Sequence, residues 1–181
     1  MPELPEVETI RREILPFVKG KTFLGLEIID HRNIKGISSQ QLENKLSRKK
    51  ILGIERRAKY LIAELDDGSA WITHLGMTGR WSVTGAKKQP GDFYYSEPPD
   101  PAHTHFVLET DKGARLEYND PRRFGYMDLI DGAALDEHPL FKGLGPEPLS
   151  NAFHEGHLKK AFAGKKTSVK AALLDQRVVA G

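Results

Sequence analysis

The sequence predicts an α+β protein in which an amino-terminal helix packs on a two-layer antiparallel β-sandwich, followed by the start of a helical domain. Three observations lead to this class. Near the amino terminus, Val7, Ile10 and Ile14 form an apolar stripe at helical spacing. Short alternating runs separated by glycine-containing turns fill the middle of the chain. From Ala133 onward the pattern changes to helical pieces.

The predicted first helix follows the stretch MPELPEVETIRR, which carries reactive groups. Pro5 stands where a helix begins, and Glu3 and Glu6 would meet the positive end of the helix dipole. Pro2 is small enough for the preceding methionine to be removed, and its ring nitrogen would then be a terminal amine that is partly unprotonated at neutral pH. Such an amine is a nucleophile suited to a sugar or carbonyl carbon. An ordinary capped helix is the alternative interpretation of these residues taken alone.

The β-sandwich is predicted from β-branched and alternating runs that are joined by tight turns. Residues 66–68 and 111–113 each contain glycine and acidic residues suited to a hairpin turn. Residues 31–43 are polar and are predicted to be irregular. Residues 84–103 contain too many prolines and glycines for a regular element, so we expect an exposed loop. The predicted strands are residues 22–29, two runs within 50–65, 70–74, 106–110 and 115–118.

The predicted sandwich ends at a linker rich in proline and glycine, GLGPEPLS, at residues 143–150. We therefore expect one domain over residues 1–142 and the start of a helical domain over residues 151–181. Ser150 is a suitable N-cap for the first helix of that region, and the last helix is predicted to begin near Thr167.

Composition limits the class of protein. No apolar run approaches the roughly 20 residues that span a bilayer, and no signal peptide is present, so a cytoplasmic protein is expected. The chain has no cysteine, which excludes disulfides and thiolate metal sites. The net charge of +2 is small, so any nucleic-acid contact must come from local clusters of charge.

Two short sequence motifs in the middle of the chain contain candidate functional residues. In ERRAKY, Arg57 and Lys59 would share one strand face, and the neighbouring like charge would make Lys59 a candidate general acid or base. A solvated strand face is the alternative. In HLGMTG, Met77 lies between two glycines and is suited to act as an apolar wedge between stacked bases, or else fills the core. For His74, in the same stretch, the simplest interpretation is a hydrogen-bonded strand residue.

Two further strings suggest contacts with nucleic acid. NDPRRFG is a predicted turn that would present Arg122, Arg123 and Phe124 together, which suits phosphate binding and base stacking. An ordinary surface turn is the alternative. A segment near the carboxyl end carries lysines and no carboxylate, and it either binds phosphates or keeps a helix face soluble. Its members are Lys159, Lys160, Lys165, Lys166 and Lys170.

These strings occur together and in order. PELPEVETIRRE, RRAKY, HLGMTG, YNDPRRFG, LGPEPLS and KKTSVKAALLDQ resemble the formamidopyrimidine-DNA glycosylase family, the bacterial 8-oxoguanine DNA glycosylases, over essentially the whole chain. The resemblance implies a bifunctional DNA glycosylase and abasic-site lyase. Such an enzyme excises oxidised purines (8-oxoguanine, formamidopyrimidines) from duplex DNA and cleaves the abasic site by β,δ-elimination. It also implies that the helical region is the start of a helix-two-turns-helix domain.

The resemblance implies roles for individual residues. The Pro2 nitrogen would attack the anomeric carbon and form an iminium, Glu3 would assist sugar opening as acid and base, and Lys59 would donate the proton for β-elimination. Glu6 would border the damaged base, and three residues would fill the gap that the flipped base leaves. The residues implied to contact DNA are Glu6, His74, Met77, His103, Arg122, Phe124 and Lys165.

The resemblance also concerns cofactors and partners. The family continues with a four-cysteine zinc finger, but this chain has no cysteine. No metal or cofactor is therefore expected here, and structural zinc is expected only in longer members. We therefore interpret the chain as an amino-terminal part of a longer enzyme. The expected partner is double-stranded DNA with oxidised purines or abasic sites. We expect a nucleoid-associated bacterial monomer that does not bind membranes.

Two other functions stay open. If Met1 is retained, the Pro2 nitrogen is part of an amide and cannot form an iminium, so the chain would be a catalytically inactive DNA-binding fragment. An amino-terminal-proline tautomerase would use the same amine as a base, but it has no need of NDPRRFG or of the lysine cluster.

Overall fold

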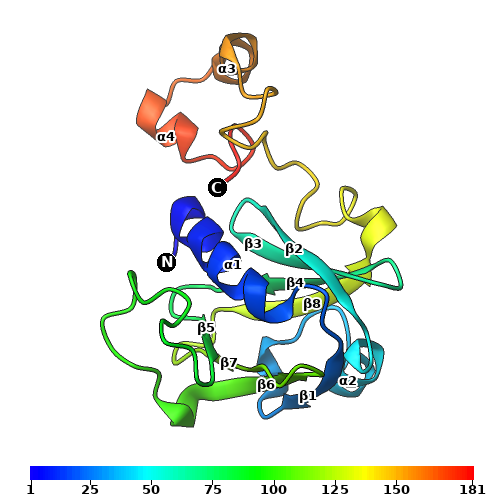
Figure 1. The fold of residues 1–181 in the computed structure, drawn as a ribbon. Coiled ribbons are helices and arrows are strands. Elements are labelled where there is room, and N and C mark those ends of the chain that lie inside the picture. Colours follow the sequence, from blue (N-terminus) through cyan, green and yellow to red (C-terminus); the bar gives the residue numbers. More distant parts are fainter. The chain divides into compact units, whose positions relative to one another are not determined.

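The computed structural model describes all residues of the chain, which divide into two units, Met1–Leu135 and Asp136–Gly181. The first unit contains a long helix and two sheets, and the second contains two short helices (Figure 1). This division falls ahead of the predicted sandwich end at residue 142, because residues 136–142 form turns and add no strand to either sheet. None of the helices combines the length and the apolar character that crossing a bilayer requires.

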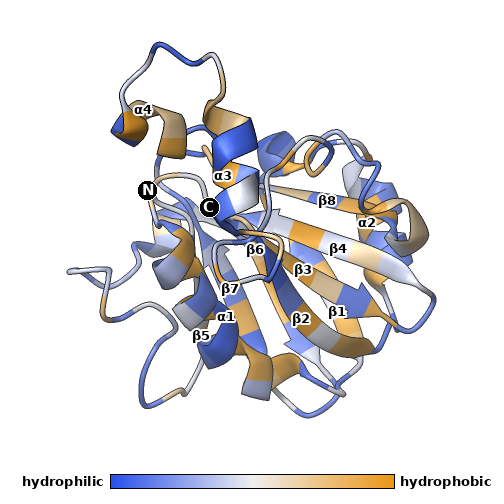
Figure 2. Cartoon of the chain, turned by 90° about the horizontal axis from the view of Figure 1, so that it is seen from above, coloured by the Kyte–Doolittle hydropathy of each residue, from blue (hydrophilic) through white to orange (hydrophobic).

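Helix α1, Leu4–Val18, is amphipathic as predicted. Val7, Ile10 and Ile14 are buried, and Val18 extends the stripe by one more turn. Blue and orange bands alternate along α1 in Figure 2, as expected for a helix with one apolar face. Pro5 lies in the first turn, where the absence of a backbone N–H costs no helical hydrogen bond. The helix therefore begins where the sequence indicated and presents its apolar face to the sheets.

Two antiparallel four-stranded sheets form the sandwich and confirm the predicted α+β class. One sheet has the order β1-β6-β7-β5 and the other has the order β2-β3-β4-β8. Both predicted hairpin turns are present, while β5 and β8 were not predicted. The strands are β1 Phe23–Ile28, β2 Ile51–Arg57, β3 Tyr60–Leu65, β4 Ser69–His74, β5 Arg80–Val83, β6 Thr104–Thr110, β7 Arg115–Asn119 and β8 Tyr126–Asp131.

The segment predicted to be irregular, residues 31–43, contains the start of helix α2, Ser39–Leu46. That prediction was wrong because polar residues dominate the stretch and conceal two helix signals. The Ser38 hydroxyl accepts a hydrogen bond from the backbone N–H of Gln41, and the Gln41 side-chain oxygen accepts one from the backbone N–H of Ser38, which forms a capping box. Leu42 and Leu46, four residues apart, are both fully buried.

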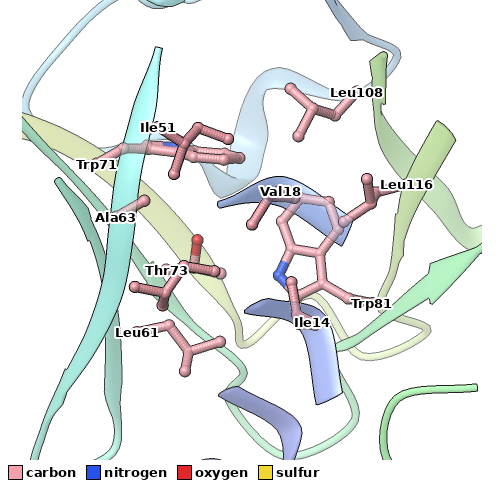
Figure 3. A pocket seen from close by; sticks show the side chains of 11 residues that line it. Ile14, Val18, Ile51, Leu61, Ala63, Trp71, Thr73, Trp81, Leu108 and Leu116 are labelled. Carbon is pink, nitrogen blue, oxygen red and sulfur yellow. The ribbon is translucent and has the colours of Figure 1, made fainter. Parts of the chain in front are cut away.

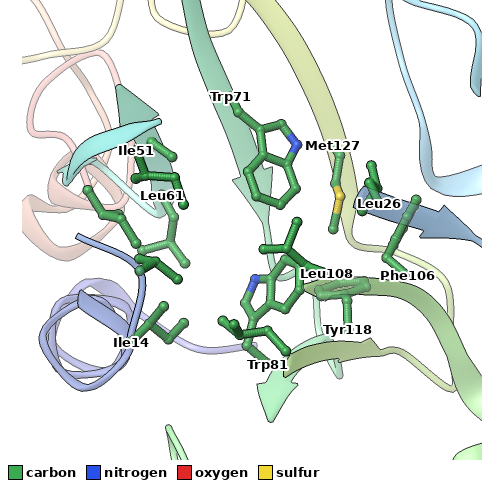
Figure 4. Close-up of a cluster of buried hydrophobic side chains, with 14 of the residues drawn as sticks. Ile14, Leu26, Ile51, Leu61, Trp71, Trp81, Phe106, Leu108, Tyr118 and Met127 are labelled. Atoms are coloured by element: carbon green, nitrogen blue, oxygen red, sulfur yellow. The ribbon is translucent and has the colours of Figure 1, made fainter. Parts of the chain in front are cut away.

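Aromatic side chains from both sheets fill the centre of the sandwich (Figure 4). Trp71 of β4 meets Trp81 of β5 edge-on, with ring centroids 5.8 Å apart. Trp81 in turn packs at 5.2 Å from Tyr118, which lies 5.8 Å from Phe106. These aromatic contacts add to the burial of large apolar surfaces. The two sheets are thereby joined by one continuous apolar core.

Helix α1 closes one side of this core. It packs against β2 and β3 and borders an internal cavity of about 30 Å³ (Figure 3). Ile14 and Val18 line the cavity from the helix, whereas Ala63 and Trp71 line it from the second sheet. The helix is thus fixed against strands β2 and β3.

The second unit contains helix α3, Glu155–Phe162, and helix α4, Val169–Leu173. The predicted N-cap Ser150 is wrong, because Ser150 lies in a turn and donates its hydroxyl to the carbonyl of Glu147. Helix α3 is instead capped by His154, whose Nδ1 accepts from the backbone N–H of His157 at 3.3 Å. A histidine ring nitrogen thus takes the place usually given to a serine or aspartate oxygen.

Candidate functional site

Two carboxylates, Glu3 and Glu6, lie at the amino-terminal end of α1. The Glu6 carboxylate accepts from the backbone N–H of Glu3 at 2.9 Å and so caps the helix. The Glu3 carboxylate lies 2.5 Å from the amine of Lys59. Pro2, buried, precedes Glu3 directly, and Met1 before it is exposed. Three of the predicted site residues, Pro2, Glu3 and Lys59, therefore come together, with Glu6 supporting them.

Lys59 reaches Glu3 from a tight turn and not from a strand. Strand β2 ends at Arg57 and β3 begins at Tyr60, so Ala58 and Lys59 form a two-residue hairpin loop. The expectation that Arg57 and Lys59 share a strand face was therefore wrong. Ala58 has φ of 52°, a left-handed conformation that costs a non-glycine residue about 1–2 kcal/mol. The Lys59 side chain is only 12% exposed, whereas that of Glu3 is 56% exposed.

His74 lies next to this turn, because it is paired across the sheet with Tyr60 on one side and with Tyr126 on the other. Its ring packs against those of Tyr60, at 4.8 Å, and Tyr126, at 5.4 Å, and the two tyrosine rings also contact each other at 6.4 Å. Burial, and then the positive charges of Lys59 and Lys35, lower the pKa of His74 to about 4. The imidazole is therefore neutral near pH 7.

The neutral imidazole has a defined tautomer. The Nδ1 atom of His74 accepts from the backbone N–H of Gly76 at 3.1 Å, so the ring proton resides on Nε2. His74 can thus offer one N–H donor without carrying a charge. A phosphate oxygen or a base edge is an acceptor that suits such a donor.

Two loops at the same end of this sheet form an apolar tip. Met77, from the loop after β4, and Phe124, from the loop before β8, are exposed by 39% and 55%. The guanidinium of Arg122 lies over the Phe124 ring at 4.8 Å. A methionine, an aromatic ring and an arginine on a solvent-exposed tip match the groups that enter a base stack.

Asp120 holds these two loops together. It is fully buried, and its carboxylate accepts from the Thr78 hydroxyl at 2.5 Å and from the Gly125 N–H at 2.8 Å. The Thr78 hydroxyl oxygen accepts in turn from the backbone N–H of Arg122 at 3.2 Å. The loops also touch directly, since a Cβ on Gly76 would lie 2.4 Å from the Gly125 nitrogen. The spacing of the tip residues is thus set by backbone contact.

Arg123 does not join the tip, although the sequence predicted that both arginines of NDPRRFG would be presented together. It adopts φ of 57°, and its Nε lies 3.0 Å from the Asp30 carboxylate. The left-handed residue turns the chain between Arg122 and Phe124, which leaves these two side chains in contact. Arg123 is therefore an anchor of the loop.

The two remaining predicted residues, His103 and Lys165, belong to different units of the chain. His103 ends the short helix η2, Pro101–His103, and its carbonyl accepts from the Asp120 N–H at 3.0 Å. It therefore belongs to the same loop framework. Lys165 belongs to the second unit, where its amine lies 3.5 Å from the Asp175 carboxylate. This ion pair neutralises part of the positive charge that the sequence predicted for the lysine-rich segment near the carboxyl end.

Sequence reasoning missed the residues that support the site. Asp120 was visible in NDPRRFG but was given no role, and Tyr60 and Tyr126 carried no signal before the register was known. Lys35 also went unnoticed, although its amine lies 3.7 Å from the centre of the Tyr126 ring. A buried aspartate between two strands is the one signal that was available, because such a group must be hydrogen-bonded.

Comparison with known sequences agrees with the family resemblance of the sequence motifs. The formamidopyrimidine-DNA glycosylase N-terminal domain profile matches residues 1–127. A formamidopyrimidine-DNA glycosylase of Phenylobacterium zucineum is 46% identical over 183 residues, covering 100% of this chain and 63% of the relative. One from Rhodopseudomonas palustris is 48% identical over 184 residues, covering 100% of this chain and 62% of the relative. The chain therefore spans less than two thirds of these relatives.

Solved structures show the same similarity. The Lactococcus lactis formamidopyrimidine-DNA glycosylase, bound non-covalently to DNA containing an AP site, matches with a TM-score of 0.84 and 33% identity. The match covers 99% of this chain and 65% of that one. The same enzyme bound to DNA containing N7-benzyl-Fapy-dG also matches with a TM-score of 0.84, covering 99% and 62%. The fold and the order of its elements are thus shared with DNA-bound structures.

Proposed function

The chain belongs to the formamidopyrimidine-DNA glycosylase family, and on that premise we propose that it takes part in base-excision repair by excising oxidised purines from duplex DNA and cleaving the resulting abasic site. The observation that carries this proposal is the 2.5 Å pair of Glu3 and Lys59 directly beside Pro2. The Lactococcus lactis structures contain DNA with an AP site or a Fapy lesion, which supports the same class of partner.

The first step uses Pro2 after Met1 has been removed. The lone pair of the Pro2 nitrogen forms a bond to C1′ of the damaged nucleotide, and the base leaves with the electron pair of the glycosidic bond. The base takes up the proton that the Pro2 nitrogen loses. Glu3 then donates a proton to the ring oxygen as the C1′–O4′ bond opens. The product is an iminium between Pro2 and the sugar.

The second step is strand cleavage. The Glu3 carboxylate, which has already given its proton to O4′, takes a proton from C2′. The electron pair of that C–H bond forms the C2′=C3′ double bond, and the C3′–O bond breaks as the phosphate leaves. Lys59 supplies the proton that the departing phosphate takes up, and the proton on Glu3 can then pass to Lys59, because the two groups lie within hydrogen-bond distance. Removal of the second phosphate by δ-elimination completes the proposed reaction.

The DNA is bound by the apolar tip and by the donors around it. Met77, Arg122 and Phe124 enter the gap left by the extruded nucleotide, because a base must leave the stack before its C1′ can be attacked. His74 contributes its uncharged N–H, and His103 and Lys165 contribute contacts to the backbone. Glu6 borders the damaged base. We propose that the protein acts on DNA as a monomer.

The zinc finger of longer family members cannot be built from these residues. The chain contains no cysteine, and no group of three or more histidine, aspartate or glutamate side chains is arranged to hold a metal ion.

A second candidate function depends on processing of the amino terminus. The chain has Met1 ahead of Pro2, and while that methionine is present the Pro2 nitrogen belongs to an amide and has no lone pair to give. A chain in this form would bind DNA through the same tip without excising a base. The two functions differ only in processing of the amino terminus.

Borohydride trapping on duplex DNA with one abasic site tests the proposal. We expect a chain verified by mass spectrometry to begin at Pro2 to give a covalent adduct. A matched chain with a permanent extension ahead of Pro2 should bind the same duplex and give at least about 100-fold less adduct, because its nitrogen is acylated. Binding without adduct by both chains would support the DNA-binding fragment, and neither binding nor adduct would reject the family's activity and leave a tautomerase.

A further inference from the structure

Glu8, one turn along α1 from the site, is surrounded by arginines. Its carboxylate accepts from Arg11 at 2.9 Å, from Arg12 at 2.7 Å and from Arg56 at 3.3 Å. The hydrogen bonds from Arg11, opposed in part by burial, lower the pKa of Glu8 to about 2. The carboxylate therefore stays ionised, and its side chain is only 23% exposed. One largely buried anion thus holds three cations in place.

Two of these arginines bind the backbone around the turn that carries Lys59. Arg56 donates to the carbonyl of Ala58 at 2.8 Å, and Arg11 donates to the carbonyl of Ile54 at 2.8 Å. Strand β2 is at the edge of its sheet, so the Ile54 carbonyl has no neighbouring strand to accept from on that side. The Arg11 guanidinium takes the place of that strand, whereas Arg56 binds the turn that follows β2.

The carbonyl that Arg56 binds belongs to the strained residue of the site. Ala58 has positive φ, and such a conformation persists only when surrounding contacts fix it. Lys59 follows directly, and its amine must stay near the Glu3 carboxylate. An unbroken series of contacts therefore runs from Glu8 through Arg56 and Ala58 to Lys59.

We propose that Glu8 is a positioning residue, which through Arg56 and the Ala58 carbonyl fixes the direction in which the Lys59 amine points toward Glu3. This inference rests on the proposed function, because it assigns Glu8 to the elimination step that Lys59 serves. The contacts described here lead from Glu8 to the turn that carries Lys59, so we expect elimination to depend on them more than the attack by Pro2 does. Misplacement of a catalytic group by about 1 Å costs about 100-fold in rate.

The test separates the two steps in chains that begin at Pro2. In E8Q, which keeps the size of the side chain and removes its charge, we expect borohydride adduct formation within about twofold of wild type and elimination at least about tenfold slower. The pH profile of elimination should also change, which a loss of stability alone would not cause. E8D, which retains the anion, should recover part of the rate.

Glu13 provides a matched control on the same helix. Its carboxylate is 21% exposed, and it pairs with Lys88 at 2.7 Å and with the Gly91 N–H at 2.8 Å, away from the turn. E13Q should leave both steps within about twofold of wild type. If E8Q and E13Q slow elimination equally, or if E8Q slows adduct formation as much as elimination, the positioning role is wrong.

A second measurement does not need activity. Acetylation of Lys59 by a water-soluble ester, followed by mass spectrometry, reports how well its amine is held against Glu3. We expect Lys59 to react at least about threefold faster in E8Q than in wild type or E13Q, with other lysines unchanged. Equal reactivity in all three overturns the inference. A wild-type chain that forms no adduct overturns the proposed function instead, and the acetylation result still decides the role of Glu8.

Discussion

At the scale of single residues, His74 shows how burial can select the chemical form of a side chain. Its ring packs against two tyrosines, and its pKa falls to about 4 because burial and two nearby lysines disfavour the charged form. An unfolded histidine titrates near 6.5. Between these two values the unfolded chain therefore binds more protons than the folded chain does.

This difference predicts a pH dependence of stability. The contribution of His74 to the free energy of unfolding is fully present above pH 6.5, and it is lost as the pH falls toward 4. Between pH 7 and pH 4, we expect wild type to lose up to about 3 kcal/mol more than His74→Gln. Urea unfolding at a series of pH values measures this. Parallel curves for the two proteins would show that His74 is not held neutral.

At the scale of elements, the two loops of the apolar tip are set by a glycine contact. Gly76 has φ of +61°, and a Cβ there would lie 2.4 Å from backbone atoms of Phe124 and Gly125. Real Cβ atoms do not approach backbone so closely. The loop after β4 and the loop before β8 therefore come together only with glycine at this position.

Gly76→Ala and Gly85→Ala form a matched pair that tests this contact. Gly85 has a similar φ of +76°, but a Cβ added there would meet nothing within 4 Å. We expect Gly85→Ala to cost about 1 kcal/mol from backbone strain alone. Gly76→Ala should cost about 3 kcal/mol or more and weaken binding to duplex DNA. Thermal unfolding and a binding titration measure both, and equal costs would mean that the loops do not constrain each other.

The same scale shows what sequence could and could not predict. Helix α1 and the two main hairpins were predicted because their apolar period and turn residues are local signals. Helix α2 was missed because its capping box and two leucines lie in a polar stretch. The site residues were predicted from the resemblance of short sequence motifs to those of the family. The contact of Lys59 with Glu3, in contrast, depends on the two-residue turn between β2 and β3. No local pattern encodes that distance.

At the scale of the whole chain, the two units differ in what can stabilise them. Every residue of the main apolar cluster lies between Val7 and Leu129, within the first unit. The second unit has helices of eight and five residues, shorter than the roughly 12–15 residues at which isolated helices become stable. The carboxyl-terminal segment of this unit packs against Gly145. A Cβ added at Gly145 would lie 2.6 Å from the backbone of Val178, so only glycine fits at this position.

We therefore expect residues 1–135 to fold as a separate chain and residues 136–181 to be largely unfolded when separate. Calorimetry should give one cooperative transition for the first fragment and no sharp transition for the second. Slow hydrogen exchange in β4 and β6 of the first fragment would confirm that the sandwich is intact. A broad transition for residues 1–135 would mean that the apolar cluster alone is insufficient.

The two tryptophans of the chain, Trp71 and Trp81, pack against each other in the sandwich core. Ultraviolet emission excited at the indole band therefore originates entirely in the first unit, and the second unit is optically silent in that signal. Any event confined to Asp136–Gly181 will leave the emission spectrum unchanged. An indole introduced into α3 would give that segment a signal of its own.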